Sequence, residues 1–261
     1  MWSAPGTGQR GGFKGHAEQP FWQWVASWAR AIRRPSDLGY PDHGYHLPPL
    51  HHRTHMVQAP DPDPTDPDPT GEGLLPLAAR GLRQERAESR ATLTRRCETA
   101  AAALADAPTA VAWCHLNDES RLLARLIDGA VEVTGTDTPE AKEDKLTAFG
   151  RGQIRVLVIK PRIGAWGLNW QHCHRMTWFP THSYEQYYQA VRRSWRFGQP
   201  HPVTVDLITT PGGARALTNL HRKAAQAARM FDALTTHMRD AAPAAPHIGY
   251  DTPVEVPPWA S

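Results

Sequence analysis

The feature that most constrains the fold of this chain is a regular alternation of short apolar runs with helical segments between residues 110 and 209. Short apolar runs bounded by turn residues are typical of buried strands. The segments between them have helical character, as where Thr138 can cap a helix that has Pro139 at its first position. Such alternation predicts an α/β fold, a parallel sheet with helices on both faces. The predicted strands are AVAWCH (110–115), AVEV (130–133), IRVLVI (154–159), RMTWF (175–179) and VTVDLIT (203–209).

The flanking segments divide the chain into four parts. Residues 1–58 have aromatic residues at helical spacing and then a turn-rich stretch, so we expect a helical and irregular N-terminal segment. Residues 59–73 are rich in Asp and Pro and are predicted to form a stiff linker, because such a composition cannot pack a core. Residues 74–240 contain helical segments and the predicted sheet, and residues 241–261 are predicted to be a disordered tail.

The composition excludes several classes of protein. A net charge of +3 over 261 residues permits a nucleic-acid partner without requiring one. Three scattered cysteines are too few for a disulfide framework, which favours a reducing compartment. No run approaches the length of a membrane-spanning helix, and the N-terminus lacks the apolar core of a signal peptide. We therefore expect a cytoplasmic protein with no membrane partner.

A glycine-containing loop, KPRIGAWGLNWQHCH, follows the predicted strand at 154–159. In open parallel sheets, ligands bind at the loops that follow the strands. Gly164 and Gly167 would let the backbone approach a phosphate or ribose closely, and Lys160 and Arg162 would add positive charge. Taken alone the loop is a weak signal, because glycine-rich turns after strands are also common as purely structural features.

The segment QAVRRSWRFGQ (189–199) is the second candidate site. The predicted helix YEQYYQAVRRSW would place Gln189, Arg193 and Arg196 within a narrow arc of one helical face. A row of one amide and two guanidinium groups predicts a surface that binds an anion.

The two segments in this order resemble motifs V and VI of superfamily 2 helicases, in the branch of the Snf-type chromatin remodellers and their phage relatives. The tail of motif VI in that branch reads roughly Q-x-x-x-R-x-x-R-x-G-Q. The segment VAWCHLNDESRLLARLI looks like motif IV of the phage-type members, and FWQWVASWARAIRRPSDLGY…LPPL resembles the segment that joins their two ATPase lobes. The resemblance covers roughly residues 13–58 and 75–240. The motif VI matches are Gln189, Arg193, Arg196, Gly198 and Gln199.

The resemblance implies a RecA-like lobe that closes on ATP held by a first lobe. It implies that Arg196 is an arginine finger on the γ-phosphate and that Arg193 is a second phosphate or interlobe contact. This sequence departs from its relatives in having Gly164-Ala165 where they usually have Ala-Gly, which leaves the geometry of this loop open. The implied sites are catalytic Arg196 and Arg193, ATP-binding Gln189, Gly167 and Asn169, and nucleic-acid-binding Lys160, Arg162 and Asn117.

The parts of such a motor that bind the β-phosphate and Mg²⁺ are missing from the sequence. No G-x-x-x-x-G-K-[ST] motif occurs, and DESR (118–121) imitates an acidic magnesium box but reads as the start of a helix. We therefore expect the C-terminal half of an ATP-dependent DNA helicase or translocase, with ATP and Mg²⁺ bound only when a P-loop-bearing first lobe or intact helicase is supplied in trans. The alternative is a binding or regulatory module that holds DNA or RNA without ATPase activity.

Other features have two interpretations each. The residue types of His51, His52 and His55 suit a metal site, but a solvated loop explains them better, and local packing explains HCH (172–174), so no metal site is predicted. The aromatic stripe at 21–28 is either core or a base-stacking surface. The arginines at 80–96 alternate with glutamates, which favours a solvated helix face.

Overall fold

A computed structural model describes residues 15–28, 31–58, 82–164 and 167–241. The chain forms two compact units, one of residues 44–225 and one of residues 1–43 with 226–261. The predicted Asp/Pro linker at 59–73 lies outside the described residues, as does nearly all of the predicted tail.

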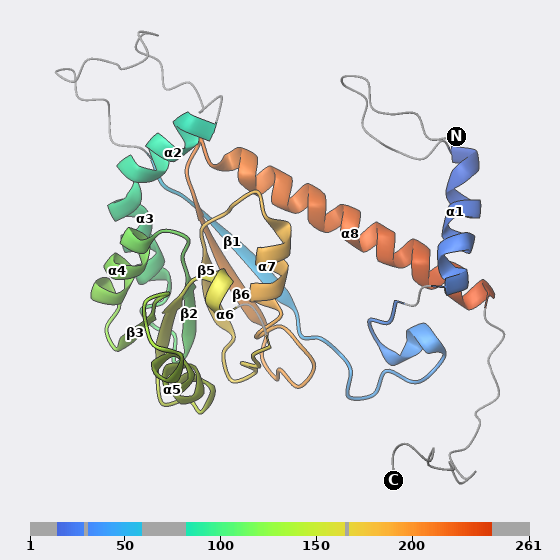
Figure 1. Cartoon of the computed structure of the whole chain (residues 1–261), viewed down its shortest axis with the longest axis horizontal. Helices are drawn as coiled ribbons and strands as arrows, with labels where there is room; N and C mark the ends of the chain where they lie inside the picture. Colours follow the sequence, from blue (N-terminus) through green and yellow to red (C-terminus); the bar gives the residue numbers. More distant parts are fainter. Residues whose placement is uncertain (1–14, 29–30, 59–81, 165–166, 242–261) are drawn as a thin grey trace. The chain divides into compact units, whose positions relative to one another are not determined.

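The larger unit contains a six-stranded sheet in which every pairing is parallel (Figure 1). The strand order is β1-β6-β5-β2-β4-β3. Five of the strands coincide with the five predicted apolar runs. The strands are β1 (Leu50–Met56), β2 (Ala110–Trp113), β3 (Ala130–Val133), β4 (Val156–Ile159), β5 (Arg175–Trp178) and β6 (Val203–Thr209).

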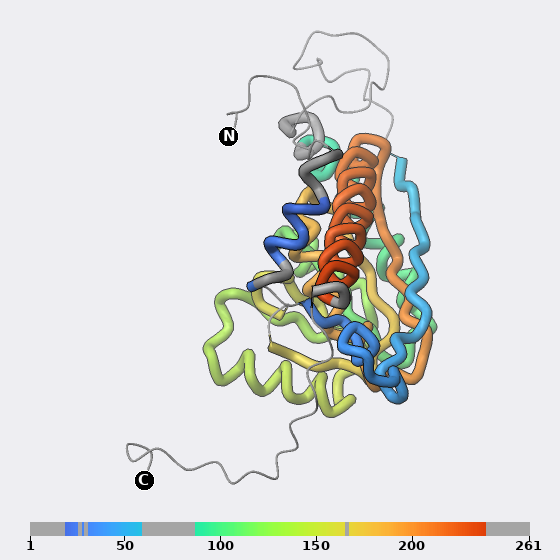
Figure 2. Tube along the Cα trace, turned by 90° about the vertical axis from the view of Figure 1, so that its right-hand side faces the viewer, coloured from blue at the N-terminus to red at the C-terminus, as the bar shows by residue number. Residues whose placement is uncertain are grey.

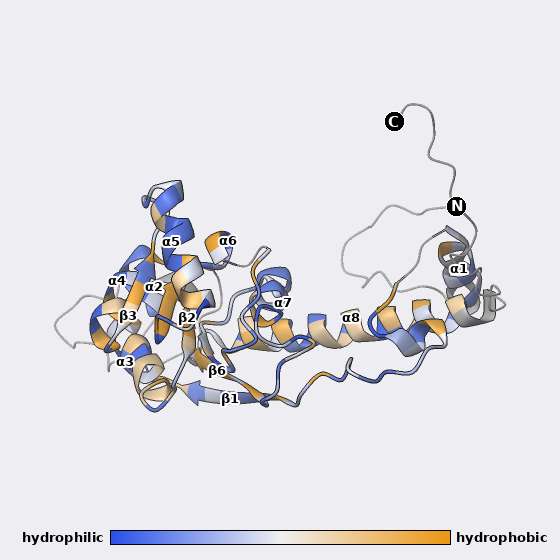
Figure 3. Ribbon diagram, turned by 90° about the horizontal axis from the view of Figure 1, so that it is seen from below, coloured by the Kyte–Doolittle hydropathy of each residue, from blue (hydrophilic) through white to orange (hydrophobic). Residues whose placement is uncertain are grey.

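Strand β1 corrects the sequence interpretation, which placed its histidines in a solvated loop. It pairs with β6 along its whole length, from Leu50 opposite Val203 to Met56 opposite Thr209. Most of its side chains are exposed, and Figure 3 shows the strand in hydrophilic colours. An edge strand of this kind is held by main-chain hydrogen bonds, which carry no hydrophobic pattern. The sheet therefore begins inside the segment that was expected to be irregular.

Helices cover both faces of this sheet, as predicted. Alternate residues of one strand face opposite ways: Ala110 and Ala112 of β2 join the core cluster under α3 and α4, whereas Val111 and Trp113 join the cluster under α7. The α/β class, with a parallel sheet that has helices on both faces, is thus confirmed. The helices of this part of the chain are α2 (Leu82–Ala91), α3 (Leu93–Ala103), α4 (Asn117–Leu126), α5 (Pro139–Gly150), α6 (Pro161–Gly164), α7 (Tyr184–Val191) and α8 (Ala214–Ala241).

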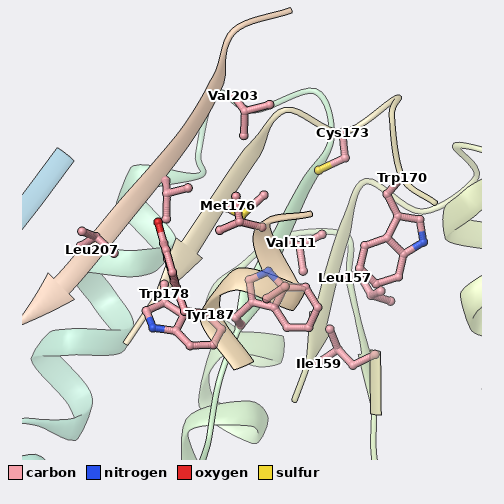
Figure 4. Close-up of a cluster of buried hydrophobic side chains, with 14 of the residues drawn as sticks. Val111, Leu157, Ile159, Trp170, Cys173, Met176, Trp178, Tyr187, Val203 and Leu207 are labelled. Atoms are coloured by element: carbon pink, nitrogen blue, oxygen red, sulfur yellow. The ribbon is translucent and has the colours of Figure 1, made fainter. Parts of the chain in front are cut away.

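Large aromatic side chains fill the core on the α7 face (Figure 4). The Trp113 ring lies 5.9 Å from that of Trp170 and 6.4 Å from that of Trp178, centroid to centroid. Trp170 also meets Phe149 edge-on at 5.2 Å. Because Trp170 belongs to the predicted glycine-containing loop, this loop is anchored in the core by its own tryptophan.

The smaller unit contains α1 (Gly15–Trp28), a 3₁₀ turn (Pro35–Leu38) and the later part of α8, which Figure 2 shows as one continuous helix. The buried Asp37 accepts hydrogen bonds from the backbone N–H groups of Arg33 and Arg34. Trp24 and Trp28 of the aromatic stripe are not core among the described residues, because they are 60% and 64% exposed, and their rings meet edge-on at 5.4 Å.

Candidate functional site

Helix α7, which contains the first residues of the segment QAVRRSWRFGQ (189–199), ends earlier than the sequence pattern predicted. Ser183 caps α7, and the helix ends at Val191. Residues 192–198 form tight turns in which the N–H of Arg193 bonds to the carbonyl of Ala190, three residues back. Gly198 has a φ of +85°, a conformation that side-chain-bearing residues rarely adopt. The prediction that Arg196 shares a helix face with Gln189 is therefore wrong: Arg196 lies in the turn beyond the helix.

Arg193 is a clamp between the two motifs. Its guanidinium donates to the carbonyl of Leu168 at 2.9 Å, and to the carbonyl and side-chain oxygens of Gln189 at 3.1 and 3.2 Å. Its own carbonyl accepts from the N–H of Trp170 at 2.8 Å. The side chain is 9% exposed, and burial, followed by the charge of Arg196, lowers its pKa. Arg193 and Gln189 thus join motif VI to the glycine-containing loop.

We expect Arg193→Met to lower the free energy of unfolding by about 1–3 kcal/mol, because the carbonyl of Leu168 and the side chain of Gln189 would lose a charged donor. The measurement is urea denaturation. The matched control is Arg196→Met, which we expect to change stability by less than about 0.5 kcal/mol. Equal loss in both variants would contradict the clamp.

Gln199 is also engaged within the protein. Its amide nitrogen donates to the carbonyls of Cys173 and Ser194 at 2.9 and 3.3 Å, and its oxygen accepts from the N–H of His201. Cys173 is fully buried, and His172 packs on Phe149 at 5.0 Å. The HCH segment therefore serves local packing, as its pattern indicated.

Arg196 differs from its neighbours in having no partner. It is half-exposed, and no side chain or carbonyl among the described residues accepts a hydrogen bond from its guanidinium. It lies at the edge where the strands begin, since Trp195 donates to the carbonyl of Pro48 just before β1, and Gln199 to that of Cys173 just before β5. The anion-binding row thus reduces to one free guanidinium held on a rigid turn.

The predicted nucleic-acid residues lie at the opposite edge, where the strands end. Lys160 follows β4 and its ammonium donates to the side-chain oxygen of Asn117, which begins α4 after the neighbouring strand β2. Arg162 is exposed in α6, one turn further on. The structure therefore brings Lys160 and Asn117 together, and it separates them from Arg196 by the length of the strands.

The glycine-containing loop connects the two edges. Gly167 has a φ of +71°, and both Gly167 and Asn169 are exposed. A Cβ on Gly164 would lie 2.6 Å from Cδ1 of Ile159 and 3.3 Å from the Trp170 ring. This packing explains why the chain has glycine at position 164; residues 165–166 lie outside the described residues.

One buried ion pair, between Arg96 and Glu119, was not predicted from the sequence. Arg96, which was assigned to a solvated face, is 4% exposed and donates to Oε1 of Glu119 at 2.8 Å, while the other carboxylate oxygen accepts from the N–H groups of His115 and Leu116. The guanidinium also lies over the ring of Phe179 at 4.8 Å. The available signal was the position of Glu119 in the first turn of α4, where a carboxylate caps the helix.

This pair borders a cavity of about 380 Å³ at the edge where the strands end. Among the described residues, no group of three or more His, Cys, Asp or Glu side chains is placed to hold a metal ion. Within the same part of the chain, no helix has the length and apolar character needed to cross a lipid bilayer.

Comparison with known proteins gives only partial structural matches. No protein-family model matches the sequence, and no curated protein matches it. The C-terminal part of the Fun30 ATPase domain aligns with 43% of this chain at 12% identity and a TM-score of 0.39. A DEAD box protein from the hyperthermophile Methanococcus jannaschii aligns with 49% of this chain at 16% identity and a TM-score of 0.43. S. cerevisiae Dbp5 bound to RNA and ADP BeF3 aligns with 57% of this chain at 11% identity and a TM-score of 0.43. The aligned regions cover 39%, 36% and 43% of those chains, respectively.

Proposed function

We propose that this chain is the C-terminal RecA-like lobe of an ATP-dependent DNA helicase or translocase of superfamily 2, of the Snf-type, phage-like branch. The observation that carries the proposal is the division of labour within motif VI. Arg193 and Gln199 are buried and hydrogen-bonded, whereas Arg196 stands on the same turn with its guanidinium free. A cation held rigidly without a partner is suited to an anion that arrives from outside the lobe.

In this proposal Arg196 is the arginine finger. A first lobe in trans, with its P-loop, would supply bound ATP and Mg²⁺, whose chemistry is to polarise the γ-phosphate for attack by water. The guanidinium can contact two phosphate oxygens at once and offset the charge that develops on them. The turns at 192–198 hold the backbone of Arg196 in place before the lobes meet, so that only its side chain has to be ordered at closure.

The other residues expected to bind ATP, Gly167, Asn169 and Gln189, would act through the glycine-containing loop, which Arg193 contacts at Leu168. Gly167 and Asn169 are exposed on either side of Leu168, whose carbonyl accepts from Arg193. Gln189 accepts from the same guanidinium. A nucleotide that moves Arg196 would therefore move these residues too, and through them the part of the loop nearer to Lys160.

Lys160, Asn117 and Arg162 would form part of a track for DNA or RNA. An ammonium and a guanidinium contact phosphates without reading bases, so we propose weak binding without sequence preference. The ion–dipole contact between Lys160 and Asn117 keeps the lysine at the edge of the sheet while its charge stays unpaired with any described carboxylate.

We expect Lys160→Gln to weaken binding of a single-stranded oligonucleotide uniformly across sequences and to reduce the slope of log affinity against log salt by about one. Fluorescence anisotropy over a salt series measures this. Lys142→Gln is the control, because Lys142 lies on α5 with its ammonium bonded to the carbonyl of Gly135. A salt slope that is unchanged in Lys160→Gln would remove Lys160 from the track.

The second candidate function is a nucleic-acid-binding or regulatory module without ATPase activity. It is favoured by the absence of a P-loop sequence motif from the chain. The test is ATP hydrolysis by the purified chain with DNA, alone and then with a P-loop-bearing first lobe. Turnover that requires both chains supports the motor; no turnover in either mixture, with nucleic-acid binding retained, supports the module. Turnover by the chain alone would overturn both.

A further inference from the structure

Two tyrosine rings of α7 are followed by the side chain of Arg192, an arginine that lies between the rings of Tyr188 and Trp195. The rings of Tyr184 and Tyr188, one helical turn apart, lie 5.9 Å from each other. One turn further, the guanidinium carbon of Arg192 lies 5.2 Å from the Tyr188 ring and 4.5 Å from the Trp195 ring. Arg192 is not among the motif VI positions that match the helicase pattern, so this arrangement needs a separate explanation.

The two rings fix the position of the Arg192 guanidinium. Trp195 is itself anchored, since its ring N–H donates to the carbonyl of Pro48 at 2.7 Å. Contact with an aromatic face stabilises a cation through the negative charge of the ring face. The Nε of Arg192 is buried without a hydrogen-bond partner among the described residues, and one Nη approaches the carbonyl of Trp195 at 3.5 Å. The Tyr188 and Trp195 rings thus contact the faces of the guanidinium. Most of its N–H groups, which point outward in the plane of the group, have no acceptor among the described residues.

The electrostatics of this turn favour an anion. Arg192, Arg193 and Arg196 lie within five residues, and none of them forms an ion pair with a carboxylate of the described residues. Arg193 directs its donors inward, so two guanidinium groups with free donors remain. The peptide bond that joins Trp195 to Arg196 is the one that Arg192 approaches, which places both groups at the same turn.

We propose that Arg192 and Arg196 together bind one phosphate-bearing ligand, and that Tyr188 and Trp195 hold Arg192 in place for this contact. The ligand chemistry is a phosphate oxyanion, from either a nucleoside triphosphate or the backbone of a single-stranded nucleic acid. The inference rests on the proposed function of Arg196 and adds to it a second guanidinium and an aromatic clamp.

The test follows the arginine Nε–Hε signals of the whole chain by NMR, with Arg192 assigned from the signal missing in Arg192→Lys. Inorganic triphosphate is titrated in one arm and a short oligothymidylate in the other. We expect the Arg192 signal to shift on titration. Affinity should fall at least about fivefold in Arg192→Gln, because a bidentate charged contact is lost, and by a smaller factor in Tyr188→Leu, which keeps the charge. Arg222→Gln, an exposed arginine on α8, should bind like the parent.

The outcomes separate this inference from the proposed function. If Arg192→Gln binds triphosphate more weakly than the parent, the site is assigned to a nucleotide. If Arg192→Gln binds only the oligothymidylate more weakly, the site is assigned to nucleic acid. Either result supports the inference. If Arg196→Gln weakens binding while Arg192→Gln matches Arg222→Gln, the finger stands and the inference fails. If neither arginine variant differs from Arg222→Gln, the inference fails, and the finger is decided separately by turnover with a P-loop-bearing first lobe. If Arg192→Gln does not fold, Tyr188→Leu still tests the inference. Equal affinity in Tyr188→Leu and the parent would show that the Tyr188 ring does not hold Arg192 in place.

Discussion

Arg196→Lys is expected to reduce single-turnover ATP hydrolysis by about 10³- to 10⁵-fold when this chain is combined with a P-loop-bearing first lobe. The lysine keeps the charge but not the planar pair of donors that can contact two phosphate oxygens of the transition state. The loss should fall on the chemical step, because among the described residues no group accepts a hydrogen bond from the Arg196 guanidinium, and the backbone hydrogen bonds of Arg196 with Ser194 and Gln199 do not depend on the side chain.

Two controls accompany this prediction. The melting temperature of Arg196→Lys should match that of the parent, since the hydrogen bonds that hold this turn come from the buried side chains of Arg193 and Gln199. Arg222→Lys, an exposed arginine outside the site, should retain full turnover. Full turnover in Arg196→Lys would remove the finger assignment, and a lowered melting temperature would assign the residue to the fold instead.

Arg96→Met is expected to cause the largest loss of stability among single substitutions of charged residues, about 3–5 kcal/mol. Methionine fills much of the same volume but leaves the carboxylate of Glu119, which is 3% exposed, without its cation. That carboxylate holds the N–H groups of His115 and Leu116 at the start of α4, so the motif IV segment should loosen as well.

A double variant tests the cause of this loss. Arg96→Met with Glu119→Gln should recover part of the stability, because the glutamine oxygen still accepts from the two N–H groups and carries no charge to bury. Arg121→Met breaks an exposed ion pair with Asp118, at 3.7 Å, and should change stability by less than about 1 kcal/mol. Urea unfolding of the four proteins measures all of these values. Similar losses in Arg96→Met and Arg121→Met would contradict a buried pair that stabilises the fold.

Local patterns in the sequence determined most of the larger unit. Strands β2 to β6 were predicted because each is a short, largely apolar run, which is visible in composition alone. Strands β2, β4 and β6 are fully buried and β5 nearly so, whereas the edge strand β3 is only partly buried. The helix caps were equally local: Thr138 accepts from the N–H of Ala141, and Ser183 from that of Gln186. The contact between Lys160 and Asn117 was not predicted, because it depends on the pairing of β2 with β4, which only the structure shows.

Only the tertiary structure decided which charged residues are free. Arg193 and Arg196 look equivalent in sequence, yet the Arg193 guanidinium donates to the carbonyl of Leu168, 25 residues away, and the Arg196 guanidinium donates to no acceptor among the described residues. Arg96 is separated from Glu119 by 23 residues, and strand β1 from β6 by about 150. A hydrogen bond or ion pair between such distant residues leaves no periodic trace in the chain, because neither partner changes the pattern of its own neighbours. Hydrophobic burial repeats along a strand or helix and can be read from sequence, whereas the partner of a single polar group is set by the packing of the whole fold.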